Sequence, residues 1–411
     1  MNLNMRKVLV AAALLGVCLC APLSMAGSKG ASRARPAAVD PRSYMHGIGA
    51  ASDGNGNLWV FFSSSGLPPR GPGRDRNWTH DVYVARWSPL QRNLETPRIF
   101  ISRPEAQEPV SIAQNDTGRV IVSFEDGWNT ASEVNQRYGV YTSGLDAVKA
   151  YPVDVKVGGH SGHVAAVGSR FVVFYSDDWI DGGGVDNLGT GNGVYLKTYD
   201  EDGTLLKSVD VAPRVREWWP MIAGSPTHAL LIWQQFVPGA TYARLKSAVF
   251  DPEDGSLTEA RVLAPSLRYY TYAAAYVPAL DRFLVVATGF DGKGFAQLID
   301  ETGATSATLA CMPASVRESS IAVVGDHAYV PAQDGRLLDL KLGASSIELA
   351  GAQRSPVKWG ETGSIGLVRS PTALHWITLT QQGPKEAEFD LKAMRPATAA
   401  DRCGRQAFGS R

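Results

Sequence analysis

The chain has no net charge, few cysteines and, after its first residues, no long apolar segment. Its 411 residues carry 40 basic and 40 acidic side chains and only four cysteines. Because there is no basic excess to attract nucleic acid, we expect no nucleic-acid partner. Gly-rich phosphate loops, a nucleophile elbow and a Cys-x-x-Cys pair are also absent after residue 26. No short motif therefore points to nucleotide, serine-hydrolase or dithiol chemistry.

The first 26 residues have the pattern of a secretory signal peptide. Arg6 and Lys7 precede an apolar run at residues 8–19, and Ser24-Met25-Ala26 places small residues at the two positions that signal peptidase recognises. The run is too short to span a bilayer, and no later segment is apolar enough to do so. We therefore expect cleavage after Ala26 and a periplasmic or secreted protein without a membrane span.

Export would leave a nearly neutral chain with two cysteines. Loss of the signal peptide leaves 38 basic and 40 acidic residues. Residues 27–45 are expected to form a flexible basic leader, and residues 401–411 a C-terminal tail. Cys311 and Cys403 form an even pair in an oxidising compartment, which favours a disulfide over two free buried thiols. We expect a monomer.

A short pattern recurs along residues 46–400: an apolar residue, a small residue, a turn and then a dense apolar strand. The near-continuous apolar strands, such as residues 120–124, indicate burial on both faces of a sheet. A third strand and usually a fourth follow, joined by acidic or Gly-containing turns. The small residue recurs at intervals of 44 to 62 residues, at Ala51, Ala113, Ala165, Ala223, Ala275, Ala322 and Gly366.

These features predict an all-β fold, specifically a seven-bladed β-propeller of four-stranded antiparallel blades over residues 46–400. A small residue at one fixed position fits an innermost strand crowded around a central axis. The last repeat has only three clear strands, so its fourth is expected from residues 37–44 or from the tail after Asp401. Six or eight blades, or a pair of β-sandwiches, remain as alternatives.

The turn of the first repeat, Ser52-Asp53-Gly54-Asn55-Gly56-Asn57-Leu58-Trp59, resembles the Asp-box (BNR) motif Ser-x-Asp-x-Gly-x-x-Trp of sialidase-like propellers. Gly54 stands where the motif has its Asp. The second repeat keeps the Asp and the Gly, as Asp116 and Gly118, without the Ser and the Trp. The resemblance implies an exported propeller of a class that often handles glycans. It does not extend to sialidase catalysis, since the chain shows no arginine triad with a Tyr-Glu pair.

Counting five residues back from each small residue gives a ring of large polar, charged or aromatic residues. In a propeller, the loops that enter the innermost strands share one face with the loops that leave the second strands, so this ring would converge there. Each member alone also has a structural explanation, such as capping a strand end or wedging between blades. The ring consists of His46, Glu108, His160, Trp218, Tyr270, Arg317 and Glu361.

The ring suggests a carbohydrate-active enzyme, either a polysaccharide lyase or a glycoside hydrolase. A lyase would use His160 or His46 as the base. Arg317 would neutralise a uronate carboxylate, and Tyr270 would be the acid. A hydrolase would use the carboxylates of Glu108 and Glu361. Sugar contacts are expected from residues of the ring, its neighbours and the nearby loops, namely Trp128, Trp179, Trp218, Trp219, His163 and Glu217.

A non-catalytic glycan-binding protein or envelope scaffold is the alternative, because propellers host many unrelated functions. A polysaccharide or another glycan is the expected partner in either case. Asp177, Asp178 and Asp181 lie in an oxygen-rich loop that could bind Ca2+, although their spacing matches no defined calcium loop. No other metal or cofactor is expected.

Overall fold

The computed structural model describes residues 46–64, 80–103, 107–127, 134–177, 192–360, 363–380, 383–398 and 401. The chain divides into two units, Met1–Ala38 and Val39–Arg411, and every described residue belongs to the second. The expected signal peptide, the leader and the tail beyond Asp401 lie outside the described residues. Within the described part, no helix is long and apolar enough to cross a membrane.

The prediction of an all-β fold is confirmed, because antiparallel strands make up almost all of the regular structure. A single turn of 3-10 helix, Leu391–Ala393, is the exception among the described residues. The first three sheets follow one another along the chain. They contain β1 (His46–Ser52), β2 (Leu58–Ser64), β3 (Asp81–Ser88), β4 (Asn93–Leu94) and β5 (Arg98–Ile101); then β6 (Ser111–Gln114), β7 (Val120–Asp126), β8 (Asn135–Tyr141) and β9 (Ala147–Val157); then β10 (His160–Val167), β11 (Arg170–Ser176), β12 (Gly193–Tyr199) and β13 (Leu205–Pro213).

The remaining strands form a seven-stranded, a five-stranded and a three-stranded sheet. The seven-stranded sheet contains β14 (Glu217–Gly224), β15 (Ala229–Phe236), β16 (Ala243–Phe250), β17 (Arg261–Val277), β18 (Arg282–Gly289), β19 (Gly294–Ile299) and β20 (Thr305–Met312). The five-stranded sheet contains β21 (Ala322–Val324), β22 (His327–Pro331), β23 (Arg336–Gly343), β24 (Ser346–Arg354) and β28 (Arg395–Pro396). The last sheet contains β25 (Ser364–Ser370), β26 (Ala373–Thr380) and β27 (Gly383–Asp390).

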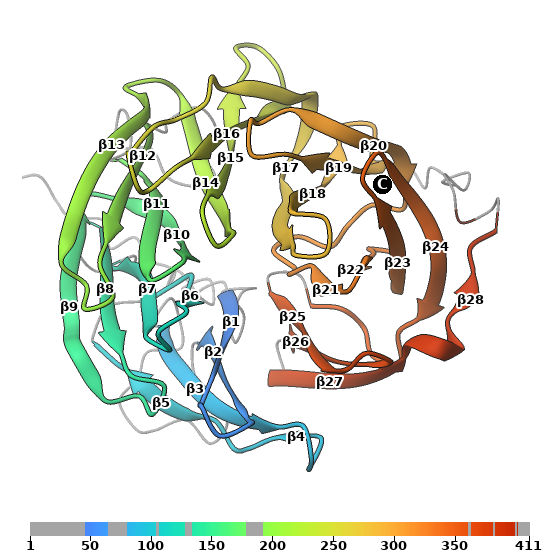
Figure 1. Cartoon of the computed structure of the whole chain (residues 1–411), viewed down its shortest axis with the longest axis horizontal. Helices are drawn as coiled ribbons and strands as arrows, with labels where there is room; N and C mark the ends of the chain where they lie inside the picture. Colours follow the sequence, from blue (N-terminus) through green and yellow to red (C-terminus); the bar gives the residue numbers. More distant parts are fainter. Residues whose placement is uncertain are drawn as a thin grey trace, which may run out of the picture. The chain divides into compact units, whose positions relative to one another are not determined.

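The long strand β17 belongs to two groups of four strands. Its first half pairs with β16 and its second half with β18. The first strand of each group also contacts the first strand of the next, in the order β1, β6, β10, β14, β17, β21, β25 and back to β1. A closed circuit of first strands, each followed by further antiparallel strands, is a propeller-like arrangement (Figure 1).

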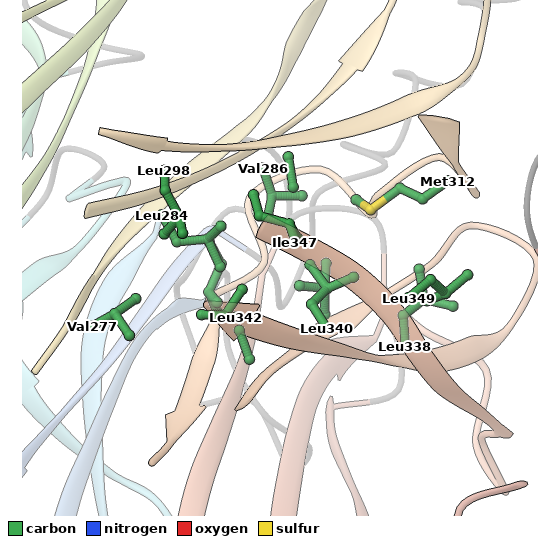
Figure 2. Packing of buried hydrophobic residues seen from close by; sticks show 14 of the residues in the cluster. Val277, Leu284, Val286, Leu298, Met312, Leu338, Leu340, Leu342, Ile347 and Leu349 are labelled. Carbon is green, nitrogen blue, oxygen red and sulfur yellow. The ribbon is translucent and has the colours of Figure 1, made fainter. Parts of the chain in front are cut away.

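Apolar contacts between successive sheets provide the core. The second strands are buried along nearly their whole length, as in β7, β15 and β26, which is the environment that their unbroken apolar sequences predict. Figure 2 shows one such interface: leucines, valines and Met312 of β17–β20 meet Leu338, Leu340, Leu342, Ile347 and Leu349 of β23 and β24. Each large apolar side chain buried in this way contributes roughly 1.5–3 kcal/mol.

Crowding between first strands explains the small residues of the repeat. A Cβ atom on Gly366 in β25 would lie 2.8 Å from the Cβ of Ala322 in β21 and 2.4 Å from the ring of Trp376. A Cβ atom on Gly224 in β14 would lie 1.9 Å from the carbonyl oxygen of Ala166 in β10. No side chain fits at either position, so the interpretation of the repeat as a crowded inner strand is confirmed at Gly366.

The turn that resembles an Asp-box is folded by its acidic side chain. The Asp53 carboxylate accepts hydrogen bonds from the backbone N–H of Asn55 at 2.7 Å and of Asn57 at 3.0 Å, and from the Asn57 side chain at 2.9 Å. Burial alone would raise the pKa of Asp53, but these hydrogen bonds outweigh it and lower the pKa. Asp200 and Asp300 fold their turns through the same two backbone contacts.

The C-terminal end is anchored to the neighbouring sheet. Strand β28 pairs with β24, and beyond it Asp401, which is buried, accepts hydrogen bonds from Arg395 at 2.7 and 2.8 Å and pairs with Arg336. Strand β27 pairs with β26 alone among the described strands, so the expected fourth strand of the last repeat lies outside them. Cys311 is disulfide-bonded; its predicted partner, Cys403, also lies outside the described residues.

Candidate functional site

Five of the chain segments that enter first strands contain a residue with a left-handed backbone. These are Gly47, Ser161, Trp219, Tyr270 and Glu318, with φ between +51° and +75°. Four of the corresponding strand pairs also show a bulge at this point. Left-handed backbone costs a non-glycine residue roughly 1–3 kcal/mol, and such strain often marks a functional site. The recurring bulge therefore marks one edge of the sheets as a candidate functional site.

The bulges correct the sequence alignment at one repeat. Gly47, Ser161, Trp219 and Glu318 each lie four residues before the small residue of their repeat, whereas Tyr270 lies five before Ala275. The small residue of that repeat is therefore Ala274, one position earlier than the sequence pattern indicates. In this repeat, Tyr269 therefore corresponds to His160, Trp218 and Arg317 of the other repeats. Tyr270 corresponds to Trp219.

The side chains of four residues meet at this edge: His163, Trp219, Tyr270 and Arg317. They come from four successive first strands or from the loops that enter them, and we call them, together with Glu318, the inner cluster. The Trp219 ring lies edge-on to Tyr270 with centroids 4.6 Å apart, and His163 lies 6.4 Å from Trp219. The Arg317 guanidinium lies over both aromatic rings, 4.7 Å from Tyr270 and 5.6 Å from Trp219. The cluster combines a cation with an aromatic platform, which stabilises the cation by about 0.5–2 kcal/mol.

The Arg317 side chain is oriented but still exposed. Its Nε donates to Glu318 Oε1 at 2.8 Å, while one third of the side chain is exposed and Glu318 is only 8% exposed. Within the described part of the chain, no acceptor lies within hydrogen-bonding distance of its two terminal nitrogens. A guanidinium held in this way presents a pair of parallel donors, the geometry that recognises a carboxylate.

The aromatic platform is rigid because a hydrogen bond from another residue holds the backbone of each of its two members, Trp219 and Tyr270. Gln234 of β15 accepts a hydrogen bond from the Tyr270 N–H at 2.7 Å, and Tyr272 donates its hydroxyl to the Trp219 carbonyl. The Trp218 indole N–H donates to the Tyr270 hydroxyl oxygen at 3.5 Å. Trp219 and Tyr270 are 2% and 7% exposed, so Arg317 is the accessible member of the three.

His160 lies behind this edge and is completely buried. Its Nδ1 is 3.0 Å from the Ser161 hydroxyl. Burial lowers the pKa of His160 to about 3, against a hydrogen bond to the backbone of Asp177 that raises it. The neutral imidazole cannot touch a ligand on the surface. His163, three residues on, is half-buried, and its Nδ1 lies 3.0 Å from the Ser161 carbonyl oxygen, so Nδ1 carries the proton and Nε2 is the basic nitrogen.

Three other predicted residues are buried in contacts with protein groups. Glu108 pairs with His80 at 3.0 Å, both side chains being at most 1% exposed. Glu217 accepts hydrogen bonds from Gln235 at 2.7 Å and Lys246 at 3.0 Å, and from the Trp233 indole. Trp218 is 1% exposed and packs on Tyr269. The structure therefore buries these three side chains, of which Trp218 contacts Tyr270 from behind, and brings His163, Trp219, Tyr270 and Arg317 together in the inner cluster.

Several predicted residues fall outside the described part of the chain. Glu361, Trp128, Trp179, Asp178 and Asp181 are among them, and of His46 only the backbone is described, paired with Ser63. Asp177, the described member of the proposed calcium loop, forms an ion pair with Lys156 at 3.2 Å. Among the described residues no group of three His, Cys, Asp or Glu side chains is arranged to hold a metal ion.

Glu318, Gln234 and His80 have structural roles at the site that the sequence pattern did not indicate. Glu318 orients Arg317, Gln234 holds the Tyr270 backbone, and the His80 Nδ1 lies 3.0 Å from the Glu108 carboxylate. Acidic residues next to arginines and amides in apolar strands are common in any sequence. Only the left-handed turn at Glu318 brings its carboxylate beside the guanidinium, and that turn has no signature in the residue itself.

Comparison with known proteins shows similarity of fold without similarity of sequence. No family model and no curated protein matches the chain. The structure is similar to a hydrazine synthase structure from Kuenenia stuttgartiensis, with 12% identity, a TM-score of 0.50, and coverage of 84% of this chain and 95% of that one. It is also similar to a point mutant of NanB sialidase from Streptococcus pneumoniae, with 9% identity, a TM-score of 0.45, and coverage of 87% and 70%. At these identities the likeness concerns the fold alone.

Proposed function

We propose that the chain is an exported seven-bladed propeller of four-stranded blades. The circuit of first strands supports this count, with β17 serving as the last strand of one blade and the first of the next. The basic start, apolar run and small residues of the first 26 residues support export to the periplasm or beyond.

The proposed function is recognition and cleavage of an acidic polysaccharide at the inner cluster. The observation that carries this proposal is the Arg317 guanidinium, which lies on Tyr270 and Trp219 with its terminal nitrogens directed to no described acceptor. A uronate presents a planar carboxylate beside an apolar sugar face. Such a ligand matches a bidentate cation supported by aromatic rings.

Cleavage would follow the elimination that polyuronates undergo. A base removes the proton on the carbon next to the carboxylate, the bond from the neighbouring carbon to the glycosidic oxygen breaks, and a carbon–carbon double bond forms. Arg317 would neutralise the carboxylate, and Tyr270 would protonate the leaving oxygen. His163 takes the role of the base, because its Nε2 is the basic nitrogen while His160 is buried.

The structure bears differently on the two alternative functions. Hydrolysis by Glu108 is disfavoured, since that carboxylate is buried against His80. Binding without cleavage is the second candidate, and the near-complete burial of Tyr270 favours it, because an acid must reach the leaving oxygen. The aromatic and cationic groups of the inner cluster would serve a lectin as well as an enzyme.

A screen of polysaccharides distinguishes these functions. The purified protein would be incubated with polygalacturonate, alginate, hyaluronate and neutral dextran, with ultraviolet absorbance reporting unsaturated uronates and a reducing-end assay reporting hydrolysis. We expect absorbance to rise with one of the acidic polymers, and Tyr270→Phe to lower that rate at least about 100-fold while binding is retained. Arg317→Gln should weaken binding and turnover together, whereas Arg354→Gln, an exposed arginine of β24, should change neither.

Each other outcome assigns the function differently. Binding that Arg317→Gln abolishes, with no absorbance change on any polymer, leaves the glycan-binding alternative and rejects the lyase. New reducing ends without absorbance indicate hydrolysis. Absence of binding to every acidic polymer rejects the inner cluster as a uronate site.

A further inference from the structure

A row of exposed arginines and of exposed or half-buried aromatic rings lies on the same edge of the sheets as the inner cluster. We call it the arginine rim; it comprises Arg216, Phe236, Tyr242, Arg244, Arg268 and Phe290. The Phe236 N–H donates to the Arg216 carbonyl at 2.9 Å, Phe236 pairs with Ala243, and Ala243 pairs with Leu267, which in turn pairs with Gly289. The six residues thus lie in or next to β14–β18, which are successive neighbours in one sheet (Figure 1).

The rim is continuous with the inner cluster at two points. Arg216 precedes Trp218 and Trp219 by two and three residues, and Arg268 precedes Tyr270 by two. The row crosses five neighbouring strand positions, which at about 4.8 Å between strands spans roughly 19 Å. A single sugar is much shorter than this, so the row suits a chain of sugars.

Among the residues that the structure describes, the arginines of the rim have no acidic partner. Arg216, Arg244 and Arg268 are all exposed, and within the described residues none lies within ion-pair distance of a carboxylate. Arg244 donates to the Gln235 side-chain oxygen at 3.3 Å, and Arg216 lies 5.7 Å from the centre of the Phe236 ring. The nearby carboxylate of Asp291 lies 3.7 Å from Lys293 instead. Three uncompensated cations on one edge of a neutral protein form a local positive field.

The aromatic residues add flat apolar surface between the cations. Tyr242 and Phe290 have ring centroids 5.4 Å apart, and Phe290 is 50% exposed. The two rings together give the rim an apolar surface on which the face of a sugar can stack. Alternation of rings and guanidinium groups is complementary to a polymer that has apolar ring faces and regularly spaced anions.

We propose that the arginine rim is an extended binding track for the acidic polysaccharide whose reacting unit binds at the inner cluster. This inference rests on the proposed function and names the ligand as a long anionic chain. Single-stranded nucleic acid also combines anions with flat rings, but the neutral charge of the whole chain and its export signal favour the polysaccharide.

The test compares long and short ligands on matched variants. The rim variant carries Arg216→Gln, Arg244→Gln and Arg268→Gln; the control carries Arg98→Gln, Arg261→Gln and Arg354→Gln, which remove the same charge from exposed positions elsewhere. Binding of polygalacturonate and alginate, of their trisaccharides and of a single-stranded oligothymidylate would be measured at several salt concentrations.

We expect the rim variant to bind the long polymer at least tenfold more weakly than the control variant, with equal affinity for the trisaccharide. The dependence of log K on log salt should become shallower by about 2, since three fewer cations displace counterions. Phe290→Ala should weaken binding of the long polymer without changing that salt dependence, because it removes stacking alone.

Several results would overturn the rim, the inner cluster or both. Equal affinities of the rim and control variants for the long polymers would exclude the rim, even where Arg317→Gln abolishes trisaccharide binding and the proposed function stands. Loss of polymer binding in the rim variant, with no effect of Arg317→Gln on any ligand, would keep the rim and reject the inner cluster. Tighter binding to oligothymidylate than to every polysaccharide would identify a nucleic-acid surface, and absence of binding to all polymers would reject both sites.

Discussion

Burial of His160 should make the folded protein less stable in mild acid than at neutral pH. The unfolded chain binds a proton at His160 near pH 6.5, whereas the folded protein binds one only near pH 3. Protons therefore favour the unfolded state as the pH falls through the interval between these values, and the stabilising contribution of the neutral imidazole is complete only above about pH 6.5. Between pH 7.5 and pH 5 this single group should lower the free energy of unfolding by about 2 kcal/mol.

Urea unfolding of the wild type and of His160→Gln at pH 7.5, 6 and 5 would measure this contribution. Glutamine has a similar volume and cannot take up a proton, so the variant should lose about 2 kcal/mol less stability than the wild type over this interval, whatever its stability at pH 7.5. Equal pH dependence in the wild type and His160→Gln would show that the imidazole is accessible to solvent, and would return His160 to the candidates for a catalytic base.

Two further predictions concern stability. Asp401→Asn should lower the free energy of unfolding in urea by about 3 kcal/mol, since it leaves Arg336 and Arg395 facing a neutral group; Asp334→Asn, at an exposed pair, should cost under about 1 kcal/mol. Gly224→Ala should cost about 1–3 kcal/mol because its Cβ meets the backbone of Ala166, whereas Gly144→Ala, with 3.6 Å of space, should change the melting temperature little.

The architecture was predictable because its signals are local. Strands buried on both faces have unbroken apolar sequences, and turns closed by an aspartate need that residue at a fixed position, as at Asp53 and Asp300. Crowding between first strands likewise requires a small residue, as at Gly366. These features depend on a few consecutive residues, so they can be recognised without knowledge of the partner strands.

The site was predictable only in part, because side-chain direction depends on the bulges. Three consecutive alanines, Ala273 to Ala275, give no sequence reason to prefer one of them, and the alignment there is wrong by one residue. Tyr270 belongs to the predicted ring only because the alignment of this repeat is shifted by one residue. Glu217 and His160 have the residue types of a binding site, yet the strands turn both into the protein. The residue types in the sequence indicate the edge of the fold where a site forms. The contacts between strands decide which of those residues face outward.

The inner cluster owes its geometry to neighbouring sheets. The N–H of Ser161 is bound by Glu125 of β7, that of Tyr270 by Gln234 of β15, and that of Ser315 by Thr288 of β18 at 3.1 Å. In each case the second strand of one group of strands holds the segment entering the next first strand. The left-handed turns are therefore fixed by backbone contacts made before any ligand arrives, which reduces the entropy lost when a ligand binds.

This dependence on neighbours also explains why an asymmetric site arises in a repeated fold. The contacts that hold each entering segment come from different residue types, a carboxylate at Glu125, an amide at Gln234 and a hydroxyl at Thr288, so each turn is stabilised separately. A large residue such as Trp219 or Tyr270 can then occupy a left-handed position in one repeat while glycine occupies it at Gly47. The repeated strands maintain the ring, and the individually held turns let one sector acquire aromatic rings and arginines without disturbing the others.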